Sequence, residues 1–479
     1  MGYPRFLLAA GASGSGKTLI TCGILQAFCS RGLQVRSFKC GPDYIDPMFH
    51  SRVLGTRSRN LDTFFTDDNT TRYLFAKTAE GADISVMEGV MGFYDGLGGI
   101  SVRASAYDLA RATDTPVVLI VNCKGMSLSV LAYIRGFLEY QPDSRIRGVI
   151  LNQLSPMLYP EIKKRIEGEL GICAFGYVPV VKDLKLESRH LGLVMPDEIQ
   201  GLRDNLRKLG GILEETLDLD GLLELGRAAS EISCCPPKLF PVTEKEEERP
   251  VVAVARDEAF CFLYEDNLEL LERTGARLEF FSPLRDVSLP RADGLLLCGG
   301  YPELYARELG ENVSMRESIR EAVAGGMPCM AECGGFMYLQ QELEDMEGNH
   351  YPMAGAIPGS AYRTEKLGRF GYITLTPRQE QMFGMDIGEI RGHEFHYFDS
   401  TECGEAFRAN KPLRKRSWDC IQGTQSCIAG FPHLYYYSNP KIAERFLKAC
   451  MKYREKDCSC NRKEKAEAVT KEIEERLSL

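Results

Sequence analysis

Short apolar runs alternate with longer stretches through the first half of the chain. Each short run has the length of a buried strand, and each is followed by a stretch long enough for a helix. Because strand–helix–strand repeats form right-handed crossovers, the pattern predicts a mostly parallel α/β sheet of the doubly wound type. The predicted strands lie at 6–10, 34–39, 82–88, 116–122, 147–152 and 174–179.

A polar segment bounded by prolines separates this half from a second α/β pattern. The stretch 202–232 is predicted to be helical from its leucine spacing, and the charged segment 236–250 follows it. New apolar runs then begin at Val251, as expected for a separate core. The predicted organisation is a first domain at 1–235, a linker at 236–250, a second domain at 251–455 and a charged tail at 456–479.

Composition and charge narrow the class of protein. The 479 residues carry a net charge of −9, which argues against nucleic acid as the main partner. We find no signal peptide and no apolar run long enough to span a membrane, so we expect a cytoplasmic enzyme rather than a membrane protein. The 17 cysteines are scattered, as expected for small buried residues in a reducing compartment. Cys458 and Cys460 in the tail are weak evidence for a metal site.

The segment Gly11–Thr18 fits the phosphate-binding template Gly-x-x-x-x-Gly-Lys-Thr between a predicted strand and a predicted helix. Gly14 and Gly16 would let the backbone wrap closely around phosphate groups. Lys17 would reach the β- and γ-phosphates, and the Thr18 hydroxyl would ligate Mg²⁺. A plain glycine-rich turn is the alternative, but packing does not explain the Lys-Thr pair.

Carboxylates follow two predicted strands near this loop. Asp43 and Asp46 come after the second strand and Glu88 ends the third, and ligands of doubly wound sheets bind at such carboxyl ends. These carboxylates could hold Mg²⁺ or position a nucleophile, whereas for the two aspartates a simple polar turn is an equal alternative. Arg59 lies in a compact polar cluster that could face an anionic substrate. Asn152 ends a strand, and its amide could read a purine edge.

A cysteine in the second domain has the setting of a nucleophile. The run 327–339 is predicted to be a strand, a sharp turn and a helix, with Cys333 at the turn. A helix N-terminus stabilises a thiolate, and the backbone N–H groups of Gly334 and Gly300 could form an oxyanion hole.

The nucleophile needs a base, and spacing alone does not choose among His393, His396 and His433. A metal bound by His393 and His396 is the poorer alternative, because no third ligand is evident.

A nucleotide site and a Cys/His site on one chain suggest a division of labour. The second domain would release ammonia from glutamine through a thioester at Cys333. The first domain would activate a carboxylate as an acyl phosphate with ATP, and ammonia would displace the phosphate. The predicted enzyme is therefore a carbon–nitrogen ligase with glutamine as the amido donor.

Several motifs, in order from about Phe6 to Leu447, resemble those of the cobyrinic acid a,c-diamide synthases, which are glutamine-dependent enzymes of cobalamin synthesis. The resemblance implies a dethiobiotin-synthetase-like phosphate-loop domain and a class I glutamine amidotransferase-like domain. It implies ATP, Mg²⁺, L-glutamine and cobyrinic acid or a related tetrapyrrole as ligands. The motifs are Gly11–Thr18, Lys39–Pro47, Ser58–Asp62, Glu88–Gly92, Glu332–Gly335 and Gly392–Tyr397.

The same resemblance assigns roles to individual residues. It implies that His433 is the base and that Asn152 reads adenine. It also implies that Asp43, Asp46 and Glu88 organise Mg²⁺ and the substrate carboxylate.

The chain departs from the class I pattern after its histidine. Many of those enzymes carry a glutamate two residues after the histidine, and relatives often carry a further histidine there, but here the residue is Tyr435. We therefore expect a Cys–His pair.

Other functions share some of these motifs. A nickel-sirohydrochlorin a,c-diamide synthase of coenzyme F430 synthesis is the alternative within the class. The alternatives outside it are a nucleotide-switched binding protein with an inactive amidotransferase domain and a glutaminase without ligase activity.

Overall fold

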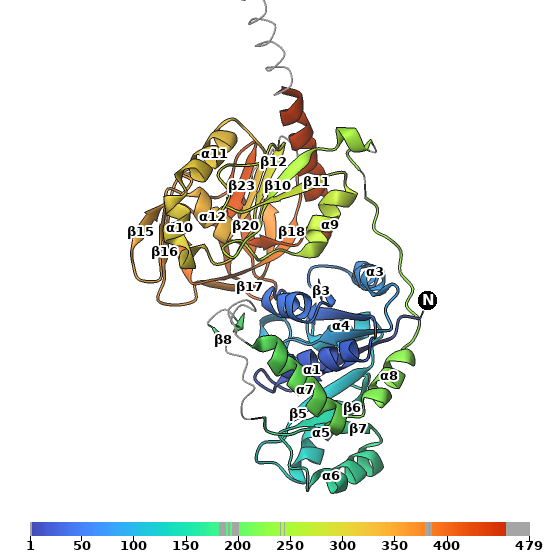
Figure 1. Cartoon of the computed structure of the whole chain (residues 1–479). Coiled ribbons are helices and arrows are strands. Elements are labelled where there is room, and N and C mark those ends of the chain that lie inside the picture. Colours follow the sequence, from blue (N-terminus) through green and yellow to red (C-terminus); the bar gives the residue numbers. More distant parts are fainter. Residues whose placement is uncertain are drawn as a thin grey trace, which may run out of the picture. The chain divides into compact units, whose positions relative to one another are not determined.

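The computed structural model describes residues 2–181, 188–189, 192–193, 201–239, 241–243, 245–378, 383 and 386–456. The chain divides into two compact units, Met1–Pro237 and Lys238–Leu479 (Figure 1). The sequence-based hypotheses about Cys458, Cys460 and the tail beyond residue 456 lie outside the described residues.

A seven-stranded parallel sheet forms the first unit, in the order β3-β2-β4-β1-β5-β6-β7. All six residues of β1 are buried, as expected for a central strand covered on both faces. The strands are β1 (Arg5–Ala10), β2 (Val35–Cys40), β3 (Arg57–Leu61), β4 (Ile84–Glu88), β5 (Val117–Asn122), β6 (Ile146–Asn152) and β7 (Cys173–Val178), with the short pair β8 (Ser188–Arg189) and β9 (Gly192–Leu193) outside this sheet.

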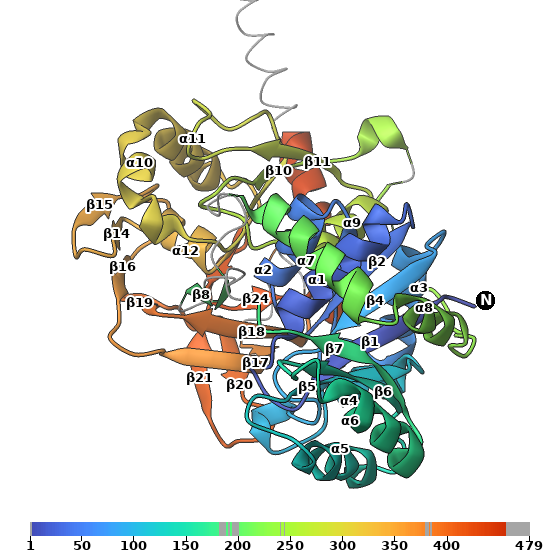
Figure 2. The ribbon, with the colours of Figure 1, turned by 60° about the horizontal axis from the view of Figure 1, so that its bottom comes forward.

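Helices connect these strands and continue after β7. Figure 2 shows α1 and α7 side by side, and the two pack so closely that a Cβ added to Gly23 would lie 2.5 Å from Leu213 Cδ1. The helices are α1 (Lys17–Ser30), α2 (Ile45–Met48), η1 (Phe49–Val53), α3 (Asp68–Ala79), η2 (Leu97–Gly99), α4 (Ala106–Ala112), α5 (Ser129–Tyr140), α6 (Tyr159–Arg165), η3 (Ile166–Leu170), α7 (Leu202–Thr216) and α8 (Leu219–Arg227).

Two local features differ from the sequence-based expectation. The polar cluster around Arg59 is an edge strand, β3, in which Ser58 and Asn60 are buried. Because most residues of β3 are polar, the strand lacks the apolar run by which a buried strand is predicted from sequence. The predicted helix at 202–232 is two helices, because the chain turns at Asp218, whose side chain caps α8 by accepting a hydrogen bond from the Gly221 amide.

The second unit contains a six-stranded sheet, β11-β10-β12-β13-β23-β22, in which only β22 runs antiparallel. A four-stranded sheet (β15-β14-β16-β19) and an antiparallel five-stranded sheet (β21-β20-β17-β18-β24) complete it. The predicted strand–turn–helix around Cys333 is present as β13 and α12.

The helices of this unit are α9 (Glu265–Arg273), α10 (Ala306–Glu311), α11 (Val313–Ala324), α12 (Gly334–Leu339), the 3₁₀ turns η5 (Glu246–Glu248), η6 (Pro302–Leu304) and η8 (Tyr436–Ser438), and a last helix whose described part covers 441–456. The strands are β10 (Val251–Ala255), β11 (Arg277–Phe281), β12 (Gly294–Leu297), β13 (Cys329–Glu332), β14 (Glu342–Glu344), β15 (His350–Pro352), β16 (Ser360–Arg363), β17 (Arg369–Pro377), β18 (Ile390–His396), β19 (Phe398–Ser400), β20 (Phe407–Asn410), β21 (Ser417–Cys420), β22 (Gln422–Gly423), β23 (Cys427–Gly430) and β24 (His433–Leu434).

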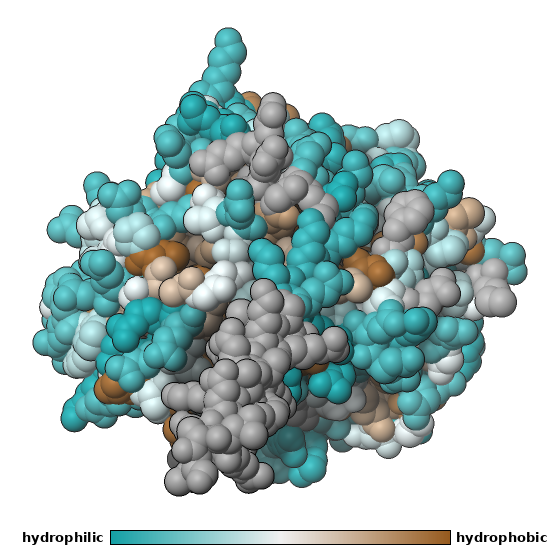
Figure 3. Space-filling model, turned by 90° about the horizontal axis from the view of Figure 1, so that it is seen from above, coloured by the Kyte–Doolittle hydropathy of each residue, from teal (hydrophilic) through white to brown (hydrophobic). Residues whose placement is uncertain are grey.

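The described helices contain none long and apolar enough to cross a membrane. The face in Figure 3 is largely hydrophilic, with hydrophobic residues in small separate patches. Scattered patches of this kind are usual on protein surfaces.

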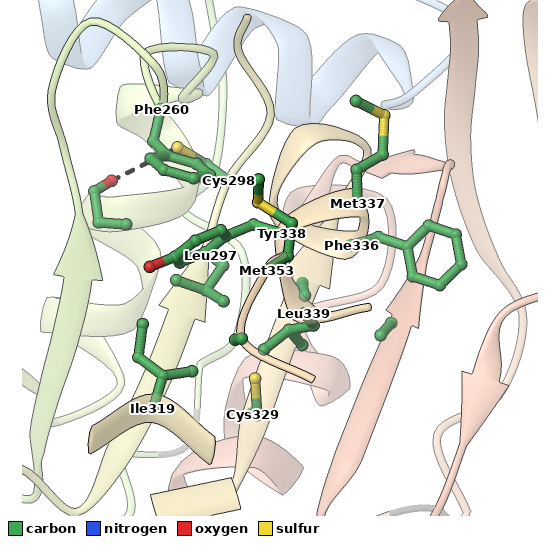
Figure 4. Packing of buried hydrophobic residues seen from close by; sticks show 14 of the residues in the cluster. Phe260, Leu297, Cys298, Ile319, Cys329, Phe336, Met337, Tyr338, Leu339 and Met353 are labelled. Atoms are coloured by element: carbon green, nitrogen blue, oxygen red, sulfur yellow. Dashed lines mark hydrogen bonds between the residues drawn. The ribbon is translucent and has the colours of Figure 1, made fainter. Parts of the chain in front are cut away.

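The hydrophobic core of the second unit lies directly under the turn at Cys333. Figure 4 shows Phe336, Tyr338 and Leu339 of α12 among the buried side chains. Phe336 is fully buried and meets Phe431 edge to face, with ring centroids 5.1 Å apart. This packing fixes the position of the helix whose N-terminus carries the thiol.

Replacing Phe336 with alanine is expected to destabilise this unit by about 3–5 kcal/mol, because the substitution leaves a cavity under α12. Urea unfolding followed by circular dichroism measures the change. The matched control is Phe280→Ala, because 47% of Phe280 is already exposed and its loss should cost far less. Equal effects of the two substitutions would contradict the assignment of Phe336 to the core.

Candidate functional site

The phosphate loop joins β1 to α1. Gly14 and Gly16 have φ angles of 74° and 90°, which glycine adopts without strain. A Cβ on Gly16 would also lie 2.5 Å from Asn152 Nδ2, so the loop requires glycine there. The 14-residue helix α1 begins directly after it, and its N-terminus favours an anion.

Lys17 is buried at the start of α1. Its Nζ donates hydrogen bonds to the carbonyl oxygens of Met91, at 2.6 Å, and Ala12, at 3.2 Å. Burial lowers the pKa of Lys17 to about 8, and the nearby charge of Lys39 adds to this effect. The side chain is thus held between the phosphate loop and the segment that follows β4.

A group of polar side chains lies where β2 and β4 end. The Thr18 hydroxyl donates to Glu88 Oε1 at 2.7 Å and lies 3.4 Å from Asp46 Oδ2. Lys39 Nζ lies 2.8 Å from the same Glu88 oxygen and also pairs with Asp46. Parallel pairing sets Lys39 opposite Glu88, so the sheet register itself creates this contact.

Charge and burial oppose each other in this group. Burial raises the pKa of Glu88, but the charge of Lys39 and the contact with His50 outweigh it and hold that pKa well below its usual range. Burial lowers the pKa of Lys39, and the carboxylates more than reverse that shift. Burial and the charge of Asp43 raise the pKa of Asp46 to about 8.

The oxygens of Thr18, Asp46 and Glu88 form the donor set that suits Mg²⁺, which prefers hydroxyl and carboxylate ligands. Asp43 is placed differently, because its Oδ1 accepts hydrogen bonds from the backbone amides of Ile45 and Asp46. The geometry therefore favours Asp46 over Asp43 beside Thr18.

Asn152 and Arg59 have other contacts. Asn152 Nδ2 donates to the Ser15 carbonyl oxygen at 2.9 Å, so this amide supports the phosphate loop. Arg59 Nη1 donates to the Ser58 carbonyl oxygen at 3.0 Å from strand β3. Their predicted contacts with adenine and with substrate stay predictions.

Two residues of this site were missed in the sequence-based prediction. Lys39 has no predicted role of its own and enters only through a predicted strand and the motif Lys39–Pro47, although a lysine at the carboxyl end of a predicted strand is itself a signal. His50 is fully buried on η1, and its Nε2 lies 3.5 Å from Glu88 Oε2. Nothing in the local sequence pattern indicates that contact.

In the second unit, Cys333 lies at the sharp turn between β13 and α12. Its φ of 47° and ψ of −103° are strained for a residue with a side chain. Its backbone amide donates to the Gly430 carbonyl oxygen at 2.8 Å. This contact ties the turn to the end of β23, three residues before His433.

Backbone amides flank the thiol. The Gly334 amide donates to the Cys333 side chain, and the Gly300 nitrogen would lie 3.1 Å from a Cβ placed on Gly334. A Cβ on Gly300 would in turn meet the Ala259 carbonyl oxygen at 2.1 Å. The two predicted oxyanion-hole amides are thus close together, in a space that only glycines permit.

His433 is buried beside the same glycine turn. A Cβ on Gly299 would lie 2.4 Å from His433 Cε1. The His393 ring stacks on the His433 ring, with ring centroids 4.9 Å apart. Burial lowers the pKa of His433 to about 3 and raises that of the Cys333 thiol. Both shifts disfavour a thiolate–imidazolium pair in the resting site.

The other two histidines have different contacts. His393 Nδ1 lies 3.3 Å from the Tyr264 hydroxyl, and His396 contacts Glu394 Oε2 and the Phe398 carbonyl oxygen. Within the described ranges, no group of three or more His, Cys, Asp or Glu side chains has a metal-binding arrangement.

Comparison with known families defines the class. Residues 6–194 match the CobQ/CobB/MinD/ParA nucleotide binding domain, and residues 251–440 match the CobB/CobQ-like glutamine amidotransferase domain. The chain is thus a nucleotide-binding protein with its own glutamine amidotransferase domain. The predicted fold class, a phosphate-loop parallel-sheet domain followed by a class I amidotransferase-like α/β domain, is confirmed.

Curated relatives define the family. A cobyrinate a,c-diamide synthase of Caldanaerobacter subterraneus is 40% identical over 454 residues, covering 94% of this chain and 98% of that protein. The enzymes of the same name from Listeria innocua and Priestia megaterium are 41% identical over 444 residues and 37% over 456, covering 91% and 94% of this chain and 97% and 98% of those proteins. The chain belongs to the cobyrinate a,c-diamide synthase family, as its motifs predicted.

Proposed function

We propose that this protein converts the a and c carboxylates of cobyrinic acid to amides, using ATP and glutamine. The observation that carries the proposal is the presence of two sites in one chain. One site has a phosphate loop beside the oxygens of Thr18, Asp46 and Glu88 and beside Lys39. The other has a strained thiol and a buried imidazole near the same Gly299-Gly300 turn. The first site suits phosphoryl transfer and the second suits amide hydrolysis.

In the first site, a carboxylate oxygen of the substrate attacks the γ-phosphorus of ATP, which yields an acyl phosphate and ADP. Lys17 binds the β- and γ-phosphate oxygens, and Lys39 neutralises charge where the carboxylate meets the phosphoryl group. Thr18, Asp46 and Glu88 would hold Mg²⁺, with Asp43 nearby, and the bound ion would further neutralise the charge of the phosphate oxygens. Ammonia then attacks the acyl carbon and phosphate leaves.

In the second site, the Cys333 sulfur attacks the side-chain amide carbon of glutamine while His433 takes the thiol proton. The amides of Gly300 and Gly334 stabilise the negative oxygen of the tetrahedral intermediate. His433 returns its proton to the departing nitrogen, which leaves as ammonia. Water hydrolyses the thioester and releases glutamate.

Assays with two tetrapyrroles test the proposal. With ATP and glutamine, cobyrinic acid is expected to give the a,c-diamide, ADP and phosphate in equal numbers per amide formed. Substrate labelled with ¹⁸O in its carboxylates is expected to transfer one label to phosphate per amide, because the acyl phosphate breaks at its acyl carbon. If only nickel-sirohydrochlorin is amidated, that compound is the substrate in place of cobyrinic acid. If neither tetrapyrrole is amidated, the proposed function is refuted.

A further inference from the structure

The position that carries an acid in many class I amidotransferases is occupied by Tyr435. That side chain is buried, and its hydroxyl donates to Asp266 Oδ2 at 3.2 Å. It therefore belongs to a contact with α9 and provides no carboxylate for His433.

A carboxylate reaches His433 from another strand. Glu332 is the last residue of β13, directly before the nucleophile, and only 7% of it is exposed. Its Oε2 lies 3.9 Å from His433 Nδ1. Because β13 and β23 are parallel neighbours, with Glu332 opposite Gly430, the sheet delivers both residues to the same end.

The other contacts of Glu332 hold its carboxyl group in place. Its Oε1 accepts a hydrogen bond from the Tyr436 hydroxyl at 3.4 Å, and the Leu434 backbone amide also donates to the carboxyl group. Both donors come from the segment that follows His433. The carboxyl group is thus fixed relative to the imidazole on two sides.

The pKa values of Glu332 and His433 favour charges on both side chains only when His433 is protonated. Burial raises the pKa of Glu332 to about 8, and it lowers the pKa of His433 to about 3. Because opposite charges attract at this separation, a proton on His433 favours the ionised form of Glu332, and an ionised Glu332 favours the imidazolium. The titratable groups that face them are Tyr436, Cys298, Cys333, His393 and His396.

We propose that Glu332 is the positioning residue of the glutaminase site. In its ionised form, the carboxylate accepts a hydrogen bond from Nδ1–H of His433, which leaves Nε2 to take the proton of the Cys333 thiol, and it stabilises the imidazolium that results. The ion-pair separation of 3.9 Å shortens to a hydrogen bond when glutamine binds. This inference rests on the proposed glutamine hydrolysis. It makes Glu332, the residue directly before the nucleophile, the third member of a Cys–His–Glu triad.

Glu332→Gln and Glu332→Asp in the full-length protein test this role. Glutamine hydrolysis by the Gln variant is expected to fall about 100-fold in kcat, with KM for glutamine within about threefold of the wild type. The Asp variant is expected to recover about tenfold of that loss, because it restores a carboxylate. Ammonia-dependent amide formation should match the wild type in both. The control is Glu308→Gln, an exposed glutamate of α10.

A structural role predicts other results. The proposal is overturned if the Gln variant keeps kcat within twofold of the wild type. It is equally overturned if kcat falls without recovery in the Asp variant, or if KM rises in proportion. A wild-type protein that hydrolyses no glutamine would refute the proposed function itself, which separates that failure from a wrong assignment of Glu332.

Discussion

The Cys333→Ala variant is expected to lose glutamine-dependent amide formation by a factor of at least about 10³, while ammonium chloride still supports synthesis. Without the sulfur no thioester forms, and neither His433 nor the oxyanion-hole amides can replace the nucleophile. The phosphate-loop site is untouched, so ATP still activates the carboxylate. Product formation with each nitrogen donor, measured on the same preparation, gives the two rates.

The matched control is Cys403→Ser, because Cys403 is a partly buried cysteine of the same unit that bonds to Asp399. It should retain both activities. An unchanged glutamine-dependent rate in Cys333→Ala would contradict the proposal and would favour a binding protein with an inactive amidotransferase domain.

The Lys17→Ala variant is expected to show the opposite pattern. Amide formation should fall by about 10³-fold or more with either nitrogen donor, because nothing else on the loop presents a positive charge to the β- and γ-phosphates. Glutamine hydrolysis at Cys333 should continue. ADP release and glutamate release, followed separately, measure the two effects.

Lys164→Ala is the control for this substitution, since Lys164 is an exposed lysine of α6. Loss of glutamine hydrolysis in Lys17→Ala would show that the two activities are coupled. Normal amide formation would remove the phosphate loop from the reaction, as expected of a glutaminase without ligase activity.

The fold followed from the sequence wherever apolar pattern and turn chemistry agreed. The strand before Gly11 and the turn at Cys333 were visible for this reason, because each depends on residues adjacent in the chain. Strand β3 was missed because its buried residues are polar, so its pattern is that of a loop.

The candidate sites were only partly predictable, for a related reason. Lys39 meets Glu88 through sheet order, and Glu332 meets His433 through the pairing of β13 with β23. The local sequence pattern predicts neither of these two strand pairings. Asp43 and Asp46 could not be ranked either, because only two residues lie between them and only the turn geometry shows which side chain accepts hydrogen bonds from the backbone.

The backbone at Cys333 sets stability against activity at one residue. A φ of 47° with ψ of −103° costs about 1–3 kcal/mol for any residue that carries a Cβ. Glycine would remove most of that cost, and with it the sulfur of the proposed nucleophile. The second unit therefore places its proposed nucleophile at a strained turn, where selection for stability alone would favour glycine.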